Sequence, residues 1–143
     1  MASRDAGDAM DLGQTMIVAG IGCRKGISIG EVDAAIAAAL IQSGLDRDQL
    51  NLIATASFKC NEAGIVGAAK ARALSLRLVT HVELESVNDR LLTRSAQVLA
   101  LKELNSVAEA AALVAAGPNA RLLAARIVLG SVTCALAKGE DLP

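Results

Sequence analysis

Short apolar runs alternate with helical segments along the first part of the chain. Residues 16–21, 50–56 and 76–82 are apolar or alternating segments of the length typical of strands. Residues 28–44 carry apolar side chains at helical spacing, and residues 61–75, which Asn61 can cap, are predicted to form a second helix. The order strand, helix, strand, helix, strand predicts parallel strands joined by right-handed crossovers.

The helix predicted over residues 28–44 has both a start signal and a stop signal. Ser28 and Glu31 match a capping box, in which the serine oxygen accepts from the amide three residues on and the glutamate reaches back. Gly44 supplies the left-handed residue that ends many helices. The predicted apolar face consists of Ile29, Val32, Ile36 and Leu40.

The next part of the chain is expected to be helical in pieces. Ser86 and Ser95 are candidate caps within residues 83–105. Ser106 and Glu109 form a second capping box, which opens an alanine-rich helix that ends at a Gly-Pro pair. This is the second clear capping box in the sequence.

Two apolar segments close the pattern and complete the predicted fold. Residues 122–129 and 132–136 are separated by Gly130 and Ser131, which predicts an antiparallel hairpin. Residues 1–14 are polar and acidic and are expected to be a disordered leader before a domain over residues 15–143. We therefore predict an α/β fold: a single compact three-layer domain with a mostly parallel sheet of about five strands and a C-terminal antiparallel hairpin.

Composition limits the core and the partners. The 143 residues suit one domain, and with 53% hydrophobic residues but a single aromatic, Phe58, the core must be aliphatic. We interpret Phe58 itself as a core residue rather than a ligand contact. The 14 basic and 15 acidic residues give a net charge of −1, which argues against a nucleic-acid surface. Aromatic platforms for stacking single-stranded bases are also missing.

The cysteines and the only histidine do not indicate a metal site or a cofactor. Cys23, Cys60 and Cys134 are scattered and form no CxxC pair, so neither a disulfide framework nor a zinc site is expected. His81 is expected to end the strand over residues 76–82 as an ordinary polar residue, with a ligand or proton-transfer role as the alternative. No signal peptide or membrane-length apolar run is visible, so a cytoplasmic location is expected.

The glycine-rich sequence GIGCRKG at residues 20–26 is the most informative segment. It links a strand to the start of a capped helix, where backbone amides and the helix dipole favour an anion. Arg24 can hold a carboxylate or phosphate with two hydrogen bonds, and Lys25 adds a mobile charge. The spacing fits neither the dinucleotide fingerprint nor the Walker loop. An anion site and a plain structural turn both remain open.

A second loop lies where the next parallel strand ends. Lys59 and Glu62 follow that strand, and the carboxyl ends of parallel strands share one edge of a sheet, where ligands bind. Ser106 and Glu109 can join them if their helix runs in the same direction. The alternative for Lys59 and Glu62 is a surface ion pair. Cys23 is either a loop-packing residue or a nucleophile with a pKa lowered by its basic neighbours.

These residues resemble the CobE/CbiG C-terminal domain family of cobalamin biosynthesis. The specific match is GIGCRKG at residues 20–26, and three weaker matches follow in order within residues 54–64, 106–113 and 132–137. The resemblance spans residues 16–139 and implies a compact α/β fold that acts in corrin-ring synthesis. In the anaerobic pathway the family domain is the C-terminal part of cobalt-precorrin-5A hydrolase, which opens a δ-lactone and releases acetaldehyde. The resemblance does not extend to the hydrolase's N-terminal domain, so we expect a protein closer to the stand-alone, aerobic type.

Two functions follow from the resemblance and the residues together. The first is binding or carriage of a corrinoid or precorrin intermediate, whose carboxylates would meet the basic loops, with other cobalamin-pathway enzymes as further candidate partners. The second is a lactone hydrolase in which Glu62, Lys59 or Cys23 acts. The candidate ligand-binding residues are Gly20, Gly22, Cys23, Arg24, Lys25, Gly26, Ser28, Lys59, Ser106 and Glu109, and the candidate catalytic residues are Glu62 and Lys59.

Overall fold

The computed structural model describes residues 15–23, 26–57, 62–91 and 107–140. Its strands are β2 Thr15–Cys23, β3 Leu52–Ala56, β4 Ser75–Val79, β5 Arg121–Leu122, β6 Ile127–Leu129 and β7 Val132–Glu140. Its helices are α2 Ile29–Gln42, α3 Ala63–Ala71, α4 His81–Ser86 and α6 Val107–Ala116, with short 3₁₀ turns η1 Arg47–Gln49 and η3 Asn88–Arg90. The predictions made for residues 1–14, Phe58, Cys60, Asn61 and Ser95 lie outside the described residues.

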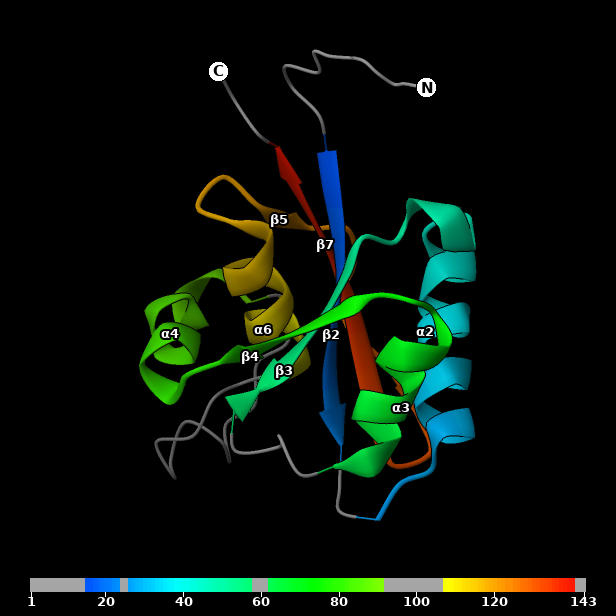
Figure 1. The fold of residues 1–143 in the computed structure, drawn as a ribbon. Coiled ribbons are helices and arrows are strands. Elements are labelled where there is room, and N and C mark those ends of the chain that lie inside the picture. Colours follow the sequence, from blue (N-terminus) through cyan, green and yellow to red (C-terminus); the bar gives the residue numbers. More distant parts are fainter. Residues whose placement is uncertain (1–14, 24–25, 58–61, 92–106, 141–143) are drawn as a thin grey trace.

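One mixed sheet forms the middle of the molecule. Its strand order is β4-β3-β2-β7-β5, and β6 also pairs with β7. The strands β2, β3 and β4 are mutually parallel, whereas β7 runs antiparallel to β2, β5 and β6. Helices α2 and α3 cover one face of the sheet and α4 and α6 cover the other, as Figure 1 shows. The predicted three-layer α/β fold with a parallel core and a C-terminal antiparallel hairpin is confirmed.

The helix α2 follows the sequence signals closely. Ser28 and Glu31 form the predicted capping box, and the helix spans Ile29–Gln42. Gly44 has a φ of 69°, the left-handed conformation expected just past the end of the helix. Of the predicted apolar face, Val32, Ile36 and Leu40 are buried, while Ile29 at the first turn is 47% exposed. The local signals therefore predicted this helix to within two residues at each end.

The hairpin strand β7 lies inside the sheet. The turn at Gly130, with a φ of 62°, joins β6 to β7. β7 continues well past residue 136 and runs between β2 and β5. Its side chains are apolar on both faces, with Cys134 and Leu136 in one core cluster and Ala137 in the other. A strand that is apolar on both faces is typical of a central position.

Two predicted boundaries were wrong because partners from elsewhere in the chain move them. β2 does not turn at Gly22, because Gly22 pairs with Thr133 and Cys23 pairs with Val132 of β7. The third strand ends at Val79 rather than residue 82, because Thr80 caps a helix that the pattern did not reveal.

The residues around α4 therefore have different positions from those predicted. His81 begins α4 instead of ending a strand. Ser86 is the last residue of α4 and not a cap at the start of a helix; its hydroxyl donates to the Glu83 carbonyl oxygen at 2.6 Å. No helix among the described residues has the length and apolar character needed to cross a membrane.

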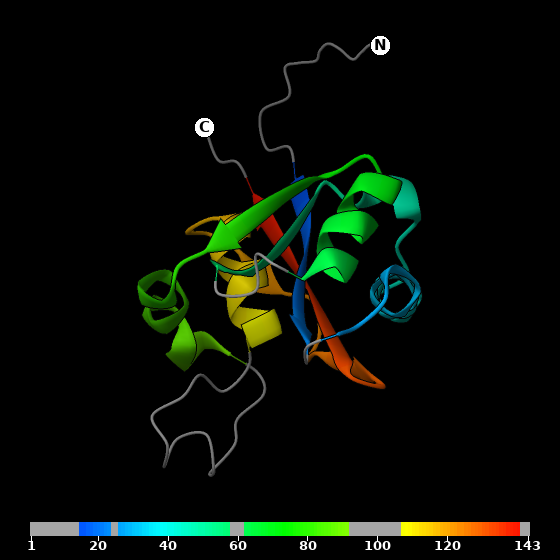
Figure 2. The same ribbon diagram turned by 60° about the horizontal axis from the view of Figure 1, so that its bottom comes forward.

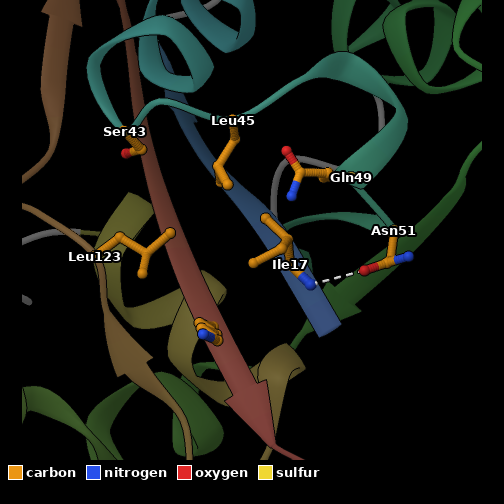
Figure 3. Close-up of a pocket in the computed structure, with 7 residues that line it drawn as sticks. Ile17, Ser43, Leu45, Gln49, Asn51 and Leu123 are labelled. Atoms are coloured by element: carbon orange, nitrogen blue, oxygen red, sulfur yellow. Dashed lines mark hydrogen bonds between the residues drawn. The ribbon is translucent and has the colours of Figure 1, made fainter. Parts of the chain in front are cut away.

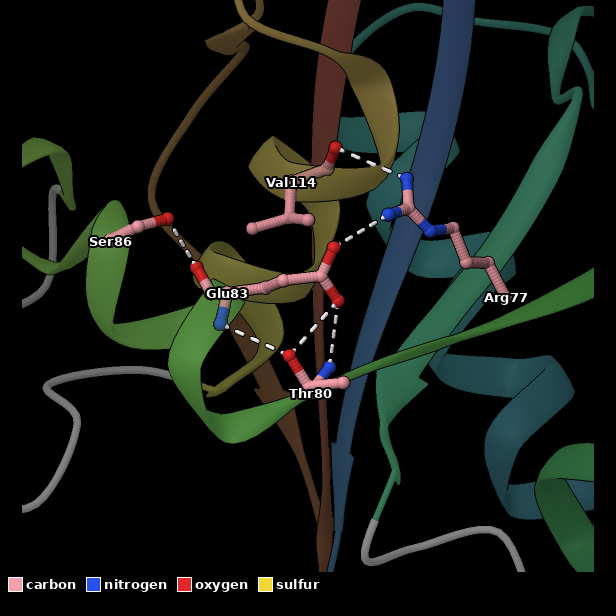
Figure 4. A network of polar contacts seen from close by, with 5 residues as sticks. All are labelled: Arg77, Thr80, Glu83, Ser86 and Val114. Atoms are coloured by element: carbon pink, nitrogen blue, oxygen red, sulfur yellow. Dashed lines mark hydrogen bonds and ion pairs between the residues drawn. The ribbon is translucent and has the colours of Figure 1, made fainter.

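A polar network holds α4 against β4 and α6 (Figure 4). Arg77 on β4 pairs with the Glu83 carboxylate at 2.9 Å and donates to the Val114 carbonyl oxygen of α6 at 3.4 Å. The same carboxylate accepts from the Thr80 amide at 2.9 Å. The Thr80 amide, helped by the Thr80 hydroxyl and the Arg77 charge, lowers the pKa of Glu83 despite partial desolvation. This network fixes the α4 start by charge-assisted hydrogen bonds at the surface.

Helix α6 packs directly on the backbone of β2. A Cβ at Gly20 would clash with the Ala108 carbonyl oxygen and lie 2.7 Å from the Ala112 amide nitrogen. A Cβ at Gly22 would lie 2.7 Å from the Thr133 hydroxyl, with the Ala108 amide nitrogen next nearest. Only glycine at position 20 lets the helix backbone come this close to the strand.

We predict that Gly20→Ala destabilises the fold by about 3 kcal/mol or more, because the methyl group meets helix backbone that cannot rotate away. The matched control is Gly30→Ala in the first turn of α2, where the new Cβ would meet only the Ser28 hydroxyl at 3.8 Å. Its effect should be neutral or slightly stabilising, because alanine favours a helix over glycine. Urea unfolding measures both, and equal stability of the two variants would contradict the packing described.

Candidate functional site

Three helices begin at the edge of the sheet where β2 and β3 end. The two strands are neighbours and parallel, so Cys23 and Ala56 finish at the same edge. A Cβ at Gly64 in the first turn of α3 would lie 2.6 Å from the Ile27 carbonyl oxygen, just before α2. The start of α6 lies beside Gly22 near the end of β2. Figure 2 turns this edge toward the viewer, with α6 on one side of the strands and α2 and α3 on the other.

The start of α2 already holds a carboxylate of this chain. The Glu31 carboxylate accepts from the Ser28 amide at 2.9 Å, and the Ser28 hydroxyl accepts from the Glu31 amide at 3.1 Å. Both groups are exposed. Ser28, which the sequence predicted as a ligand contact, is therefore at the site but is engaged in capping. The Glu31 charge makes this helix start less favourable for a second anion.

The start of α3 is arranged differently. Glu62 occupies the N-cap position, yet its side chain makes no capping hydrogen bond. The carboxylate instead accepts from the Gly26 amide at 3.3 Å. Consequently the amides of Ala63 and Gly64 have no hydrogen-bond partner among the described residues. Uncapped first-turn amides with a helix dipole behind them are suited to a carboxylate.

The Gly26–Glu62 hydrogen bond also joins the two loops that the sequence singled out. We predicted that the loop at residues 22–27 and the loop at residues 57–62 lie near each other, and this proximity is observed. Gly26 is exposed and has a φ of 79°, a conformation that favours glycine. Arg24, Lys25, Lys59 and Ser106 lie outside the described residues, so their place in the site stays a prediction.

The other predicted residues serve packing in the described structure. Gly20 and Gly22 are within β2, where α6 and Thr133 fill the space beside them. Glu109 is completely buried in the first turn of α6, and its carboxylate accepts from the Arg126 amide at 2.8 Å. Cys23 is half-buried and packs against the core on the α2 side. Their roles toward a ligand remain predictions.

Sequence reasoning missed an apolar element at this edge. The tip of the β6–β7 hairpin lies beside the start of α2 and bounds a depression of about 410 Å³, lined by Ser28, Gly30, Glu31, Ala34, Leu129 and Gly130. Val128 is 62% exposed and Leu129 is 44% exposed. The sequence signal that could have indicated this apolar element is the pair Val128 and Leu129 directly before the turn glycine Gly130. Its position beside α2 depends on sheet topology, which the local pattern does not contain.

The remaining candidate residues form no metal site. His81 lies 3.1 Å from the Glu85 carboxylate, an exposed pair one helical turn apart. Across residues 15–23, 26–57, 62–91 and 107–140, no three His, Cys, Asp or Glu side chains gather as metal ligands would. Cys134 is buried in the core. Its burial raises the pKa of the thiol to about 12, with a small opposing effect from the Arg72 charge.

The comparisons with known proteins identify the family. The model of the cobalamin synthesis G C-terminus family matches residues 17–137, which is most of the chain. The chain therefore belongs to this family, and it is a CobE/CbiG-like protein of the cobalamin biosynthesis pathway. This agrees with the resemblance carried by residues 20–26.

Individual relatives agree with the family. The chain is 35% identical to the protein CobE of a Sinorhizobium species over 121 residues, covering 85% of this chain and 79% of that protein. A crystal structure of CobE, a protein from the cobalamin (vitamin B12) biosynthetic pathway, superposes with a TM-score of 0.82 at 32% identity, covering 90% of this chain and 94% of that one.

Two further solved structures share the fold. The cobalamin biosynthesis protein chiG from Agrobacterium tumefaciens is 41% identical with a TM-score of 0.68, covering 85% of this chain and 97% of that one. A cobalamin biosynthesis protein G homolog from Sulfolobus solfataricus is 26% identical with a TM-score of 0.69. That match covers 86% of this chain but 36% of the Sulfolobus chain, so the shared unit is one part of a longer protein there.

The raised pKa of Cys134 predicts a pH-dependent stability. Because the thiol is protonated in the folded state up to pH 12 but ionises near pH 9 when unfolded, its stabilising contribution is complete below pH 9. It should then fall by about 1.4 kcal/mol per pH unit between the two values. Urea unfolding from pH 8 to 11 measures this slope, and Cys134→Ala should make it shallower. An unchanged slope in that variant would show that other groups cause it.

Proposed function

We propose that the edge where β2 and β3 end binds a carboxylate-bearing corrinoid or precorrin intermediate. On this proposal the protein holds or carries the intermediate between enzymes of the aerobic cobalamin pathway. The observation that carries it is the start of α3, where no described residue caps the Ala63 and Gly64 amides while the Glu62 carboxylate accepts from the Gly26 amide.

The charges of the two loops support this reading. Lys25 adjoins Gly26 in the sequence, and Lys59 is three residues before Glu62. On this proposal both cations lie near the Gly26–Glu62 hydrogen bond. A corrinoid carries several carboxylates around its ring. Arg24 would contribute the bidentate geometry that a carboxylate favours. Several cations and free amides at one edge would therefore hold several carboxylates together.

The ring itself needs an apolar surface, and the same edge has one. Val128 and Leu129 at the hairpin tip are exposed, and Ile29 at the start of α2 is 47% exposed. Leu129 lines the depression beside Ser28. Aliphatic side chains can cover the ring face where the chain has no aromatic residue to stack on it. A ring flanked by carboxylates would thus meet apolar and cationic groups side by side.

The proposal also includes a cytoplasmic location and transfer of the intermediate to other pathway enzymes. It requires no metal or cofactor held by the protein.

Binding can be tested by titrating the protein with hydrogenobyrinic acid, a metal-free corrinoid, and following its visible spectrum. We expect saturable binding that the triple variant Arg24→Gln, Lys25→Gln, Lys59→Gln weakens by about 10-fold or more, because charge-assisted hydrogen bonds are lost. Binding to the parent protein should also weaken as salt increases.

The matched control is the triple variant Arg47→Gln, Lys70→Gln, Arg121→Gln, which removes the same charge from exposed positions away from this edge. It should bind as the parent protein does. Equal losses in both triple variants would point to a general charge effect, and absence of any spectral change in the parent would refute the proposal.

Hydrolysis of a precorrin δ-lactone is the second candidate, and the position of Glu62 favours it. This carboxylate does not cap its own helix and lies between the two loops of the candidate site. A carboxylate held there could accept a proton from an attacking water. Lys59 and Cys23, which belong to the same two loops, are the other candidate groups for this reaction.

We predict that, if the protein is a hydrolase, Glu62→Gln lowers the rate of acetaldehyde release from a lactone-bearing precorrin by about 100-fold or more. The glutamine oxygen can still accept from the Gly26 amide, so the loop contact survives while the basic carboxylate is lost. Glu31→Gln, an exposed carboxylate in the same edge that caps α2, is the control. Undiminished release in Glu62→Gln would exclude this role, and no release from the parent protein would leave the binding function alone.

A further inference from the structure

A second cavity lies at the opposite end of β2 from the candidate site. Its volume is about 310 Å³, and its lining residues are Ile17, Ser43, Leu45, Gln49, Asn51, Leu123 and Lys138. Figure 3 draws these lining side chains as sticks and labels all of them except Lys138. Ile17 and Cys23 are six residues apart on β2, which places the cavity about 20 Å from the edge described above. One small ligand cannot occupy both places.

The hydrogen bonds of the lining amides fix which atoms remain for a ligand. The Gln49 side-chain oxygen accepts from the Asp46 amide at 2.8 Å, and the Asn51 side-chain oxygen accepts from the Ile17 amide at 2.8 Å. Because only oxygen can accept from these amides, each side chain has its nitrogen left to donate. The nitrogen of Gln49 points toward Ile17 in Figure 3.

Lys138 is a cation on the face of β7 whose preceding side chains are apolar and buried. Val132, Cys134 and Leu136 alternate on the α2 face of β7 and are buried, and Lys138 is the next residue on that face. It is half-buried, and its side chain makes no ion pair or hydrogen bond with the described residues. Arg121 of β5 lies directly opposite and also has no acidic partner there. Two like charges in register are unfavourable unless an anion is nearby.

The rest of the lining is apolar or a hydroxyl. Ile17, Leu45 and Leu123 belong to or pack against the core cluster on this face. Ser43 adds a hydroxyl. None of the described residues that line the cavity is Asp or Glu. The walls thus combine hydrogen-bond donors and a cation with an aliphatic surface.

We propose that this cavity binds a small aliphatic monocarboxylate. The carboxylate lies against the Lys138 ammonium, the Gln49 side-chain nitrogen and the Ser43 hydroxyl, and the alkyl chain packs on Ile17, Leu45 and Leu123. The volume suits about ten non-hydrogen atoms, so an acid of four to six carbons fits. The inference does not depend on the function proposed for the opposite edge, because it uses none of the same residues.

The test is titration of the full-length protein with hexanoate at constant ionic strength, followed by backbone amide NMR. We expect saturable shifts at residues 43–51 and around Leu123 and Lys138, with a Kd of about 1 mM for a ligand of this size. The neutral isostere hexanamide should bind about 10-fold more weakly or worse. Equal binding of the amide, or shifts confined to Gly26, Ala63 and Gly64, would overturn the proposal.

Two variants test the assigned contacts. Lys138→Met keeps the aliphatic stem and should raise the Kd about 10-fold or more. Gln49→Glu still offers an oxygen to the Asp46 amide but replaces the donor by a negative charge, so it should also abolish saturable binding even if Lys138→Met folds poorly. Lys70→Met removes an exposed cation from α3 and should bind hexanoate as the parent protein does. Unchanged affinity in Gln49→Glu would refute the site.

Discussion

The arrangement of the molecule depends on the direct contact between α6 and the two central strands. Gly20 of β2 packs against the backbone of α6 near the start of the helix, and Gly139 of β7 packs against Ala116 at the end of the helix. β2 and β7 are paired along their full lengths, and both glycines lie on the face of this pair that α6 covers. The small side chains of alanine-rich α6 also allow a close approach to the strands. The contact fixes both the angle of the helix and the position of its first turn.

This packing explains why alanine replaces larger residues on the α6 side. The core cluster there consists largely of Ala54, Ala56, Ala110, Ala111, Ala112, Ala115, Ala120 and Ala137 with a few Leu and Val. The α2 side instead contains the larger Ile17, Ile21, Ile36, Ile53 and Ile65. A thin layer on one face and a thicker layer on the other let a chain without Trp or Tyr fill its interior at ordinary density. The low aromatic content is thus compatible with a full core.

The helix starts at the carboxyl edge differ in what they leave exposed. At the start of α2, Ser28 and Glu31 form a capping box, and the Glu31 carboxylate places a negative charge there that disfavours a second anion. At the start of α3 the Glu62 carboxylate accepts from the Gly26 amide instead, and no described residue caps the Ala63 and Gly64 amides. α6 has Glu109 in its first turn, but that carboxylate is buried against the Arg126 amide. Among the described residues, the start of α3 is therefore the one of these three helix starts that best suits the anion site proposed above. The sequence had pointed to α2.

The sequence predicted those features whose signals are local. The Ser28–Glu31 capping box, the Gly44 stop and the parallel order of the first three strands need only neighbouring residues to be recognised. The length of β2 and the partners of Glu62 and Glu109 could not be predicted, because each depends on residues far along the chain. The Thr80–Glu83 box was a local signal that was overlooked, since the apolar alternation before it suggested a longer strand.

We propose that the start of α3 and the loops beside it form a polyacid-binding edge. The decisive experiment is backbone amide NMR of the protein titrated with hydrogenobyrinic acid. We expect the largest shifts at Gly26, Ala63 and Gly64, with smaller shifts at Leu129 of the hairpin tip and unchanged signals for Asn51 and Leu123 at the far end of β2. Shifts concentrated on Asn51 and Leu123, with Ala63 and Gly64 unmoved, would contradict it.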